Sequence, residues 1–112
     1  MDYIINDTNI LIDIYDIDLI EEFFCLNFSF HTTDFVIDEL VDTNQRDAYG
    51  LRIKSKQLQV KTHTAKEVIE IVSFKGEIGS NVSITDCSVL LFAHKTSYTL
   101  ITGDGKLRNT AK

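Results

Sequence analysis

Residues 3–11 read Tyr3-Ile4-Ile5-Asn6-Asp7-Thr8-Asn9-Ile10-Leu11, and this stretch indicates which class of fold the chain adopts. Tyr3–Asn6 is typical of a short buried β-strand, and Asn9–Tyr15 is typical of a short apolar helix. Asp7 or Thr8 stands where the residue that caps such a helix belongs. A strand that leads at once into a helix is the repeating unit of parallel α/β sheets.

The same alternation continues along the chain. Further strands are expected at Asn27–His31, Gln57–Lys61 and Ser97–Thr102. Further helices are expected at Asp18–Leu26, Phe35–Leu40, Asp47–Lys56, from Thr64 to about Lys75-Gly76, and Asp86–His94, with the start of another at Lys106–Lys112. Between them, Asp42–Arg46 and Gly79–Val82 are expected to be loops, and Gly103-Asp104-Gly105 a turn. This order favours an α/β fold with a mainly parallel central sheet.

Three of the expected helices carry capping signals. Thr33 or Asp34 precedes the helix Phe35–Leu40. Thr64-x-x-Glu67 and Ser83-x-x-Asp86 both have the spacing of a capping box, in which the side chains of the first and fourth residues bond each other's backbone N–H groups.

Length and composition limit the possible classes of protein. The chain has 112 residues, which fits one domain spanning residues 1–112, and 44% of them are hydrophobic. It has no apolar run of about 18 residues and no basic, apolar secretory start, so a cytoplasmic protein without membrane contact is expected. The net charge of −6 argues against nucleic-acid binding through a broad basic face. Lys106 and Arg108 could still form a local basic rim, or could be solvated or pair with a partner's carboxylates.

The cysteines and histidines do not suggest a zinc site. Cys25 and Cys87 are far apart, lie among apolar residues and are expected to be buried free thiols. His31, His63 and His94 have no metal-ligand spacing relative to the cysteines. Any metal chemistry is therefore expected to involve oxygen ligands.

Carboxylates occur where strands end or where the following helices lie. These acids are Asp7, Glu39, Asp86 and Asp104. Ends of parallel strands with the same sense share one edge of a sheet, so the four side chains are expected to converge. Two unit charges about 4 Å apart repel by about 4 kcal/mol at an effective dielectric constant near 20, and a bound cation would relieve this repulsion. Oxygen ligands suit Mg²⁺ or Mn²⁺, and two such ions can promote phosphodiester hydrolysis.

Each acid taken alone also has a purely structural explanation. Asp7 could only cap a helix, and Glu39 could be an ordinary surface residue. Asp86 could interact with the helix dipole, and Asp104 could form a turn between two glycines. The metal-site hypothesis rests on the coincidence of these acids at one predicted edge.

Four motifs in this order resemble the PIN-domain nucleases, including VapC-like toxins. They are Asp7-Thr8-Asn9-Ile10-Leu11, Thr33-x-x-Val36-x-x-Glu39-Leu40, Ser83-x-x-Asp86-Cys87 and Thr102-Gly103-Asp104. The resemblance implies a three-layer α/β/α sandwich and a Mg²⁺- or Mn²⁺-dependent ribonuclease. It makes Asp7, Asp86 and Asp104 metal ligands, with Glu39 completing the shell or positioning a water molecule. By the same resemblance, Asn9 and Thr102 orient the acids, and Ser83 caps a helix beside the site.

The resemblance also implies partners. Many small members are toxins of toxin–antitoxin pairs, so an RNA substrate, an antitoxin that places an arginine in the acidic pocket and a homodimer are expected. Others process RNA. Family members usually continue into one more strand, which this chain is expected to lack, with reduced stability or self-association as the consequence.

Other classes of protein remain in competition with a nuclease. A truncated or degenerate PIN-like module could keep the acids and bind protein or RNA without turnover. A receiver-type domain fits poorly, because Thr62, His63 and Thr64 follow the expected strand Gln57–Lys61 where an aspartate is needed. A haloacid-dehalogenase-like phosphatase needs two acids at the first strand end, where this chain has Asp7 and Asn9. No phosphate-binding P-loop sequence occurs.

Overall fold

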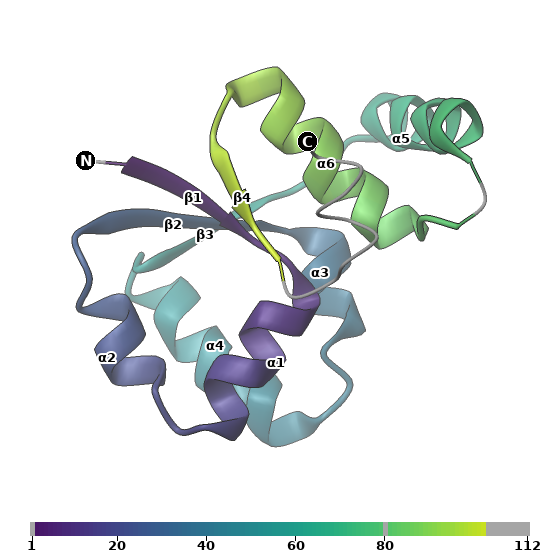
Figure 1. Ribbon diagram of the computed structural model, residues 1–112. Coiled ribbons are helices and arrows are strands. Elements are labelled where there is room, and N and C mark those ends of the chain that lie inside the picture. The colour runs from purple at the N-terminus through teal and green to yellow at the C-terminus, as the bar shows by residue number, and fades with distance from the viewer. Residues whose placement is uncertain (1, 80, 103–112) are drawn as a thin grey trace.

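The computed structural model describes residues 2–79 and 81–102. Within them lies a four-stranded sheet in the order β3-β2-β1-β4, and all three strand pairs are parallel (Figure 1). The strands are β1 (Asp2–Asn6), β2 (Phe28–Thr33), β3 (Leu58–Lys61) and β4 (Thr99–Ile101). The predicted α/β class with a parallel central sheet is confirmed.

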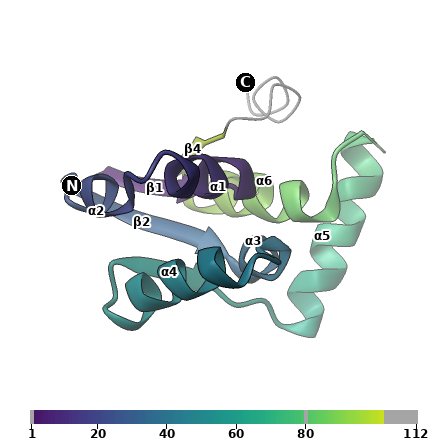
Figure 2. The same cartoon turned by 90° about the horizontal axis from the view of Figure 1, so that it is seen from below.

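Six helices within these residues flank the sheet. They are α1 (Thr8–Asp16), α2 (Ile20–Phe24), α3 (Asp34–Glu39), α4 (Thr43–Lys54), α5 (Ala65–Ile78) and α6 (Ile84–Thr96). Helices α1, α2 and α4 cover one face, while α6 lies on the other face with α5 beside it (Figures 1 and 2). The arrangement is the predicted three-layer sandwich. None of the described helices is both long and apolar enough to cross a membrane.

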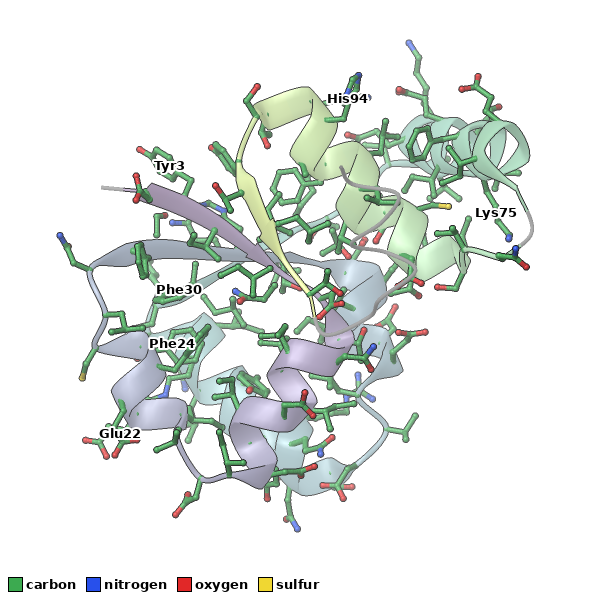
Figure 3. The ribbon with its side chains drawn as sticks, in the orientation of Figure 1. Tyr3, Glu22, Phe24, Phe30, Lys75 and His94 are labelled. Atoms are coloured by element: carbon green, nitrogen blue, oxygen red, sulfur yellow. The ribbon has the colours of Figure 1, made fainter. Side chains whose placement is uncertain are left out.

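Aromatic side chains pack against one another in the layer between the sheet and α1, α2 and α4. The rings of Phe24 and Phe30 meet edge to face with centroids 5.1 Å apart, and Figure 3 shows them side by side between α2 and β2. Tyr49 of α4 is fully buried beside Phe24, and its hydroxyl donates to the carbonyl of Leu11 in α1. Burial, with a smaller effect of the Asp16 charge, raises the pKa of Tyr49, so this hydroxyl stays protonated as a donor.

Side chains on the opposite face of the sheet are more polar. His31 of β2 is buried against Tyr98, with ring centroids 5.0 Å apart, and it also contacts Phe92 of α6. Burial lowers the pKa of His31, which favours the neutral ring. At the end of β2, the Thr33 hydroxyl forms a 2.8 Å hydrogen bond with the Ser88 hydroxyl of α6. These contacts hold α6 against the sheet.

Local capping explains where most helices begin. The Thr33 and Ser83 hydroxyls accept backbone N–H groups at the starts of α3 and α6. Thr64 and Glu67 form the complete predicted capping box of α5. Of the alternatives left open by the sequence, Asp7 caps α1 and Thr33 caps α3.

Several element boundaries differ from the prediction. Asp42–Arg46 is not a loop, because Asp42 caps α4 and Thr43–Arg46 form its first turn. Asp18 has a left-handed φ of 58°, so α2 is shorter than the predicted helix Asp18–Leu26. Helix α5 continues past Lys75-Gly76 to Ile78 and ends at Gly79, whose φ is 105°.

The predicted burial of both cysteines is wrong for one of them. Cys87 is buried in α6, but Cys25 is exposed just after α2. Both thiols are free. The short helix α2 ends at Phe24, which takes the buried position, and the chain then turns toward β2 with Cys25 on the outside.

Candidate functional site

Asp7 lies where β1 ends and α1 begins. The register pairs Asn6 with Ile101, so the ends of β1 and β4 lie side by side (Figure 1). The Asp7 side chain is buried, with only 2% of the residue exposed. One carboxylate oxygen accepts the Ile10 N–H at 2.9 Å, and the other accepts the Thr102 hydroxyl. Asp7 therefore serves as helix cap and as an oriented carboxylate at the sheet edge.

Glu39 is brought to the same edge by α3. It is the last residue of this helix and is exposed. Its Oε1 accepts the hydroxyl of Thr8 at 2.8 Å, and Thr8 directly follows Asp7 in the chain. Because α3 starts at the end of β2 and finishes beside α1, Glu39 reaches the edge although it is far from Asp7 in sequence.

Asp86 lies in the first turn of α6 and is half-buried. Its backbone N–H donates to the Ser83 hydroxyl at 3.0 Å. Two residues later, Ser88 bonds Thr33 at the end of β2, which fixes the start of α6 at the edge where the strands end. A carboxylate in the first turn of a helix is also favoured by the helix dipole.

The fourth predicted acid, Asp104, lies outside the described residues, as do Lys106 and Arg108. Of the predicted supporting residues, Thr102 bonds Asp7, Ser83 caps α6 and Asn9 is exposed in the first turn of α1. In the described part of the chain, no three His, Cys, Asp or Glu side chains are close enough to hold a metal ion. The three described acids thus share one edge but do not by themselves make a complete metal cage.

The donor chemistry at this edge fits a hard divalent cation. Asp7, Glu39 and Asp86 offer carboxylate oxygens only. Mg²⁺ and Mn²⁺ prefer such ligands, and Mg²⁺ keeps several of its waters while using one or two carboxylates. A site of this kind does not require three preformed protein ligands within the described residues.

Sequence reasoning missed one polar pair close to this edge. The carboxylate of Asp34 accepts both the backbone N–H of His63, at 2.9 Å, and its ring Nδ1, at 2.6 Å. Asp34 follows β2 and His63 follows β3, and these strands are neighbours. Their positions just past adjacent strand ends are the signal that would have revealed the pair.

One comparison with known protein families finds a match. The model of the family DUF3368, described as a PIN domain, matches residues 3–112. The comparison with curated proteins finds no match.

Proposed function

This chain belongs to the PIN-domain family, and from that premise we propose that it is a Mg²⁺- or Mn²⁺-dependent endoribonuclease. The observation that carries the proposal is the buried Asp7 carboxylate, which the Thr102 hydroxyl and the Ile10 N–H orient at the end of β1. A surface cap would not need this burial. Burying a carboxylate is costly unless hydrogen bonds or a cation stabilise it. The burial of Asp7 is therefore better explained by a functional role, such as holding a cation.

The proposed roles of the acids follow from their elements. Asp7, Asp86 and Asp104 would hold the ion, and Glu39, exposed beside Thr8, would complete the shell or position the attacking water molecule. A divalent ion bound there supplies Lewis acidity for hydrolysis of an RNA phosphodiester. Thr102 and the first turn of α1 keep one orientation of Asp7, which limits the reorganisation that binding requires.

The proposal extends to partners. A toxin of a toxin–antitoxin pair would be held inactive by an antitoxin that places an arginine among these carboxylates, because arginine matches a carboxylate with two parallel hydrogen bonds. The net charge of −6 favours a basic partner segment. A homodimer is part of the same proposal.

A PIN-like binding module without turnover is the second candidate. It is favoured by the net charge of −6, which argues against a broad basic face that would hold an RNA substrate. Such a module would bind Mn²⁺ or RNA but would leave the RNA intact. Metal-dependent cleavage by protein free of contaminating nucleases excludes it.

Replacing Asp7 by asparagine tests the nuclease proposal. Asparagine caps a helix as well as aspartate does, so α1 is preserved while the negative charge is lost. Cleavage of a fluorescent single-stranded RNA in Mn²⁺ should fall at least about 100-fold, since even the loss of a partner of a metal ligand costs about 10- to 100-fold. A chelator should stop cleavage by the parent protein.

Asp13→Asn is the matched control for this test. Asp13 lies exposed on the same helix, and its substitution makes the same chemical change. Its cleavage rate should equal that of the parent. If Asp7→Asn cuts RNA as fast as Asp13→Asn, the proposed mechanism is wrong.

A further inference from the structure

Asp34 and His63 form a partly buried pair that is joined by both backbone and side-chain hydrogen bonds. One Asp34 oxygen accepts the His63 ring Nδ1 at 2.6 Å and the Phe35 N–H at 2.9 Å. The other oxygen accepts the His63 backbone N–H at 2.9 Å. Only 6% of the His63 side chain is exposed, and its ring lies 5.4 Å from that of Phe35. The pair therefore fixes both the backbone and the ring of His63 relative to Asp34.

Asp34 carries the negative charge that makes it a strong hydrogen-bond acceptor for His63. Burial acts to raise its pKa, but the hydrogen bonds from the His63 backbone and ring and from the Phe35 N–H outweigh burial, so the pKa of Asp34 is lowered. Asp34 is thus an ionised acceptor at neutral pH. Because an ionised carboxylate can only accept, His63 Nδ1 must carry the proton that it donates.

The pair lies at one end of α3, and the proposed site lies at the other. Asp34 is the first residue of this six-residue helix, and Glu39 is the last. Glu39 in turn accepts the Thr8 hydroxyl beside Asp7. Backbone hydrogen bonds join successive turns of a helix, so a short helix moves largely as one body and a tilt at its start displaces its end.

Apolar packing alone does not fix the direction of α3. Val36 and Leu40 are buried and hold the helix on the core. Hydrophobic contacts are not directional, so they permit small rotations and shifts of a short helix. The two hydrogen bonds between Asp34 and His63 are directional and tie the start of α3 to the loop after β3.

We propose that Asp34 and His63 are a positioning pair for the acidic site, which hold α3 in the direction that presents Glu39 beside Asp7. This inference rests on the proposed nuclease function. In this proposal neither residue contacts the RNA itself. Their effect on the reaction passes through the backbone of α3.

Two substitutions at His63 distinguish the contribution of its hydrogen bond to Asp34 from the contribution of its ring. His63→Phe keeps a ring beside Phe35 but removes the donor to Asp34. His63→Asn removes the ring but places an amide N–H close to the former position of Nδ1. His94→Phe, at an exposed position of α6, makes the same change as His63→Phe away from the pair and serves as the control.

The readouts are kcat and KM for RNA cleavage and the affinity for Mn²⁺ measured by calorimetry. His63→Phe should lower kcat about tenfold with KM for RNA within about twofold, since misplacing a group by about 1 Å can cost about 100-fold. It should also weaken Mn²⁺ binding. His63→Asn should recover most of both losses, and His94→Phe should behave like the parent. Equal kcat and Mn²⁺ affinity in His63→Phe and the parent, or no recovery in His63→Asn, overturns the inference.

A second variant covers the case in which His63→Phe does not fold. Asp34→Asn weakens the same contacts from the other side, and Asp38→Asn, exposed on the same helix, is its control. Asp34→Asn should lower kcat and Mn²⁺ affinity, whereas Asp38→Asn should not. Equal effects of these two variants overturn the inference.

The outcomes for the two proposals are distinguishable. A parent that binds Mn²⁺ but cuts no RNA overturns the nuclease function. Weaker Mn²⁺ binding in His63→Phe, recovered in His63→Asn, then still supports the positioning role. A parent that neither cuts RNA nor binds Mn²⁺ overturns both proposals.

Discussion

On the face of the sheet covered by α1, α2 and α4, aromatic rings pack together, whereas hydroxyls and carboxylates gather at the edge where the strands end. Phe24 and Phe30 represent the first region, and the Thr102–Asp7 contact represents the second. Burial of rings stabilises the fold without requiring one exact orientation. A buried carboxylate needs donors in fixed positions. The apolar core and the proposed site therefore occupy different regions of this small molecule and depend on different kinds of interaction.

The largest effect on stability is expected from removing a buried ring from the apolar layer. Phe30 is 3% exposed and contacts the rings of Phe23 and Phe24, so Phe30→Ala should lower the free energy of unfolding by about 3–5 kcal/mol. Urea denaturation measures this loss. Phe28→Ala, on the same strand but with 37% of the residue exposed, should cost clearly less. Equal losses in the two variants would contradict the assignment of the core to this face.

At the polar edge, a substitution is expected to lower the rate of cleavage much more than it lowers stability. Thr102→Val keeps the shape of the side chain but removes the hydroxyl that donates to Asp7. Under the proposed role of Asp7 as a metal ligand, cleavage should fall about 10- to 100-fold, the usual cost of losing a partner of such a ligand. The free energy of unfolding should drop by only about 0.5–1.5 kcal/mol. Thr99→Val, at an exposed position of β4, is the control and should leave cleavage unchanged. Parent-like cleavage by Thr102→Val would break the division between the two regions.

The smallest effect is expected at the start of α5, outside both regions. A hydrogen bond from Lys61, followed by the capping bond to Thr64, lowers the pKa of Glu67 from 4.5 to about 2. A lowered pKa in the folded state adds stability above the unfolded value, and this stability is lost as the pH falls through the folded value. Glu67→Gln keeps the capping side chain but removes the charge.

Urea midpoints of the parent and of Glu67→Gln should therefore differ at neutral pH and converge as the pH falls from about 4.5 toward about 2. The contact is largely open to solvent, so the difference should be small and should shrink further in high salt. Glu77→Gln, exposed on the same helix, corrects for the change in net charge. A difference that stays constant down to about pH 3 would refute the charge-based explanation.

Elements with a strong apolar pattern or a capping signal could be predicted from the sequence. The stretch Tyr3–Leu11 gave β1 and α1, and the Thr64 and Ser83 signals gave the starts of α5 and α6. Helix α4 begins before the predicted start at Asp47, because Thr43–Arg46 is wholly polar and its helical signal is the Asp42 cap alone. Propensity and periodicity carry little information in such a segment.

The candidate site could be predicted only at the level of the strand ends. The alternation of elements predicts a parallel sheet whose strand ends share one edge, but it does not predict that Asp7 and Thr102 follow neighbouring strands. The contact of Glu39 with Thr8 depends on the direction of α3, and no local pattern encodes that direction. The pairing of Asp34 with His63 depends on which strands are neighbours, because 29 positions separate the two residues.

Only one of the two free thiols is exposed, so a thiol reagent can label the native protein at a single position. Cys25 is exposed at the end of the sheet where β2 begins, opposite to the ends that carry the acids. Cys87 is buried, and burial raises its thiol pKa, which keeps it a poor nucleophile. A maleimide dye or spin label should therefore couple to one position of the native protein. Such a label would report on added RNA or Mn²⁺ without occupying the edge that carries Asp7, Glu39 and Asp86.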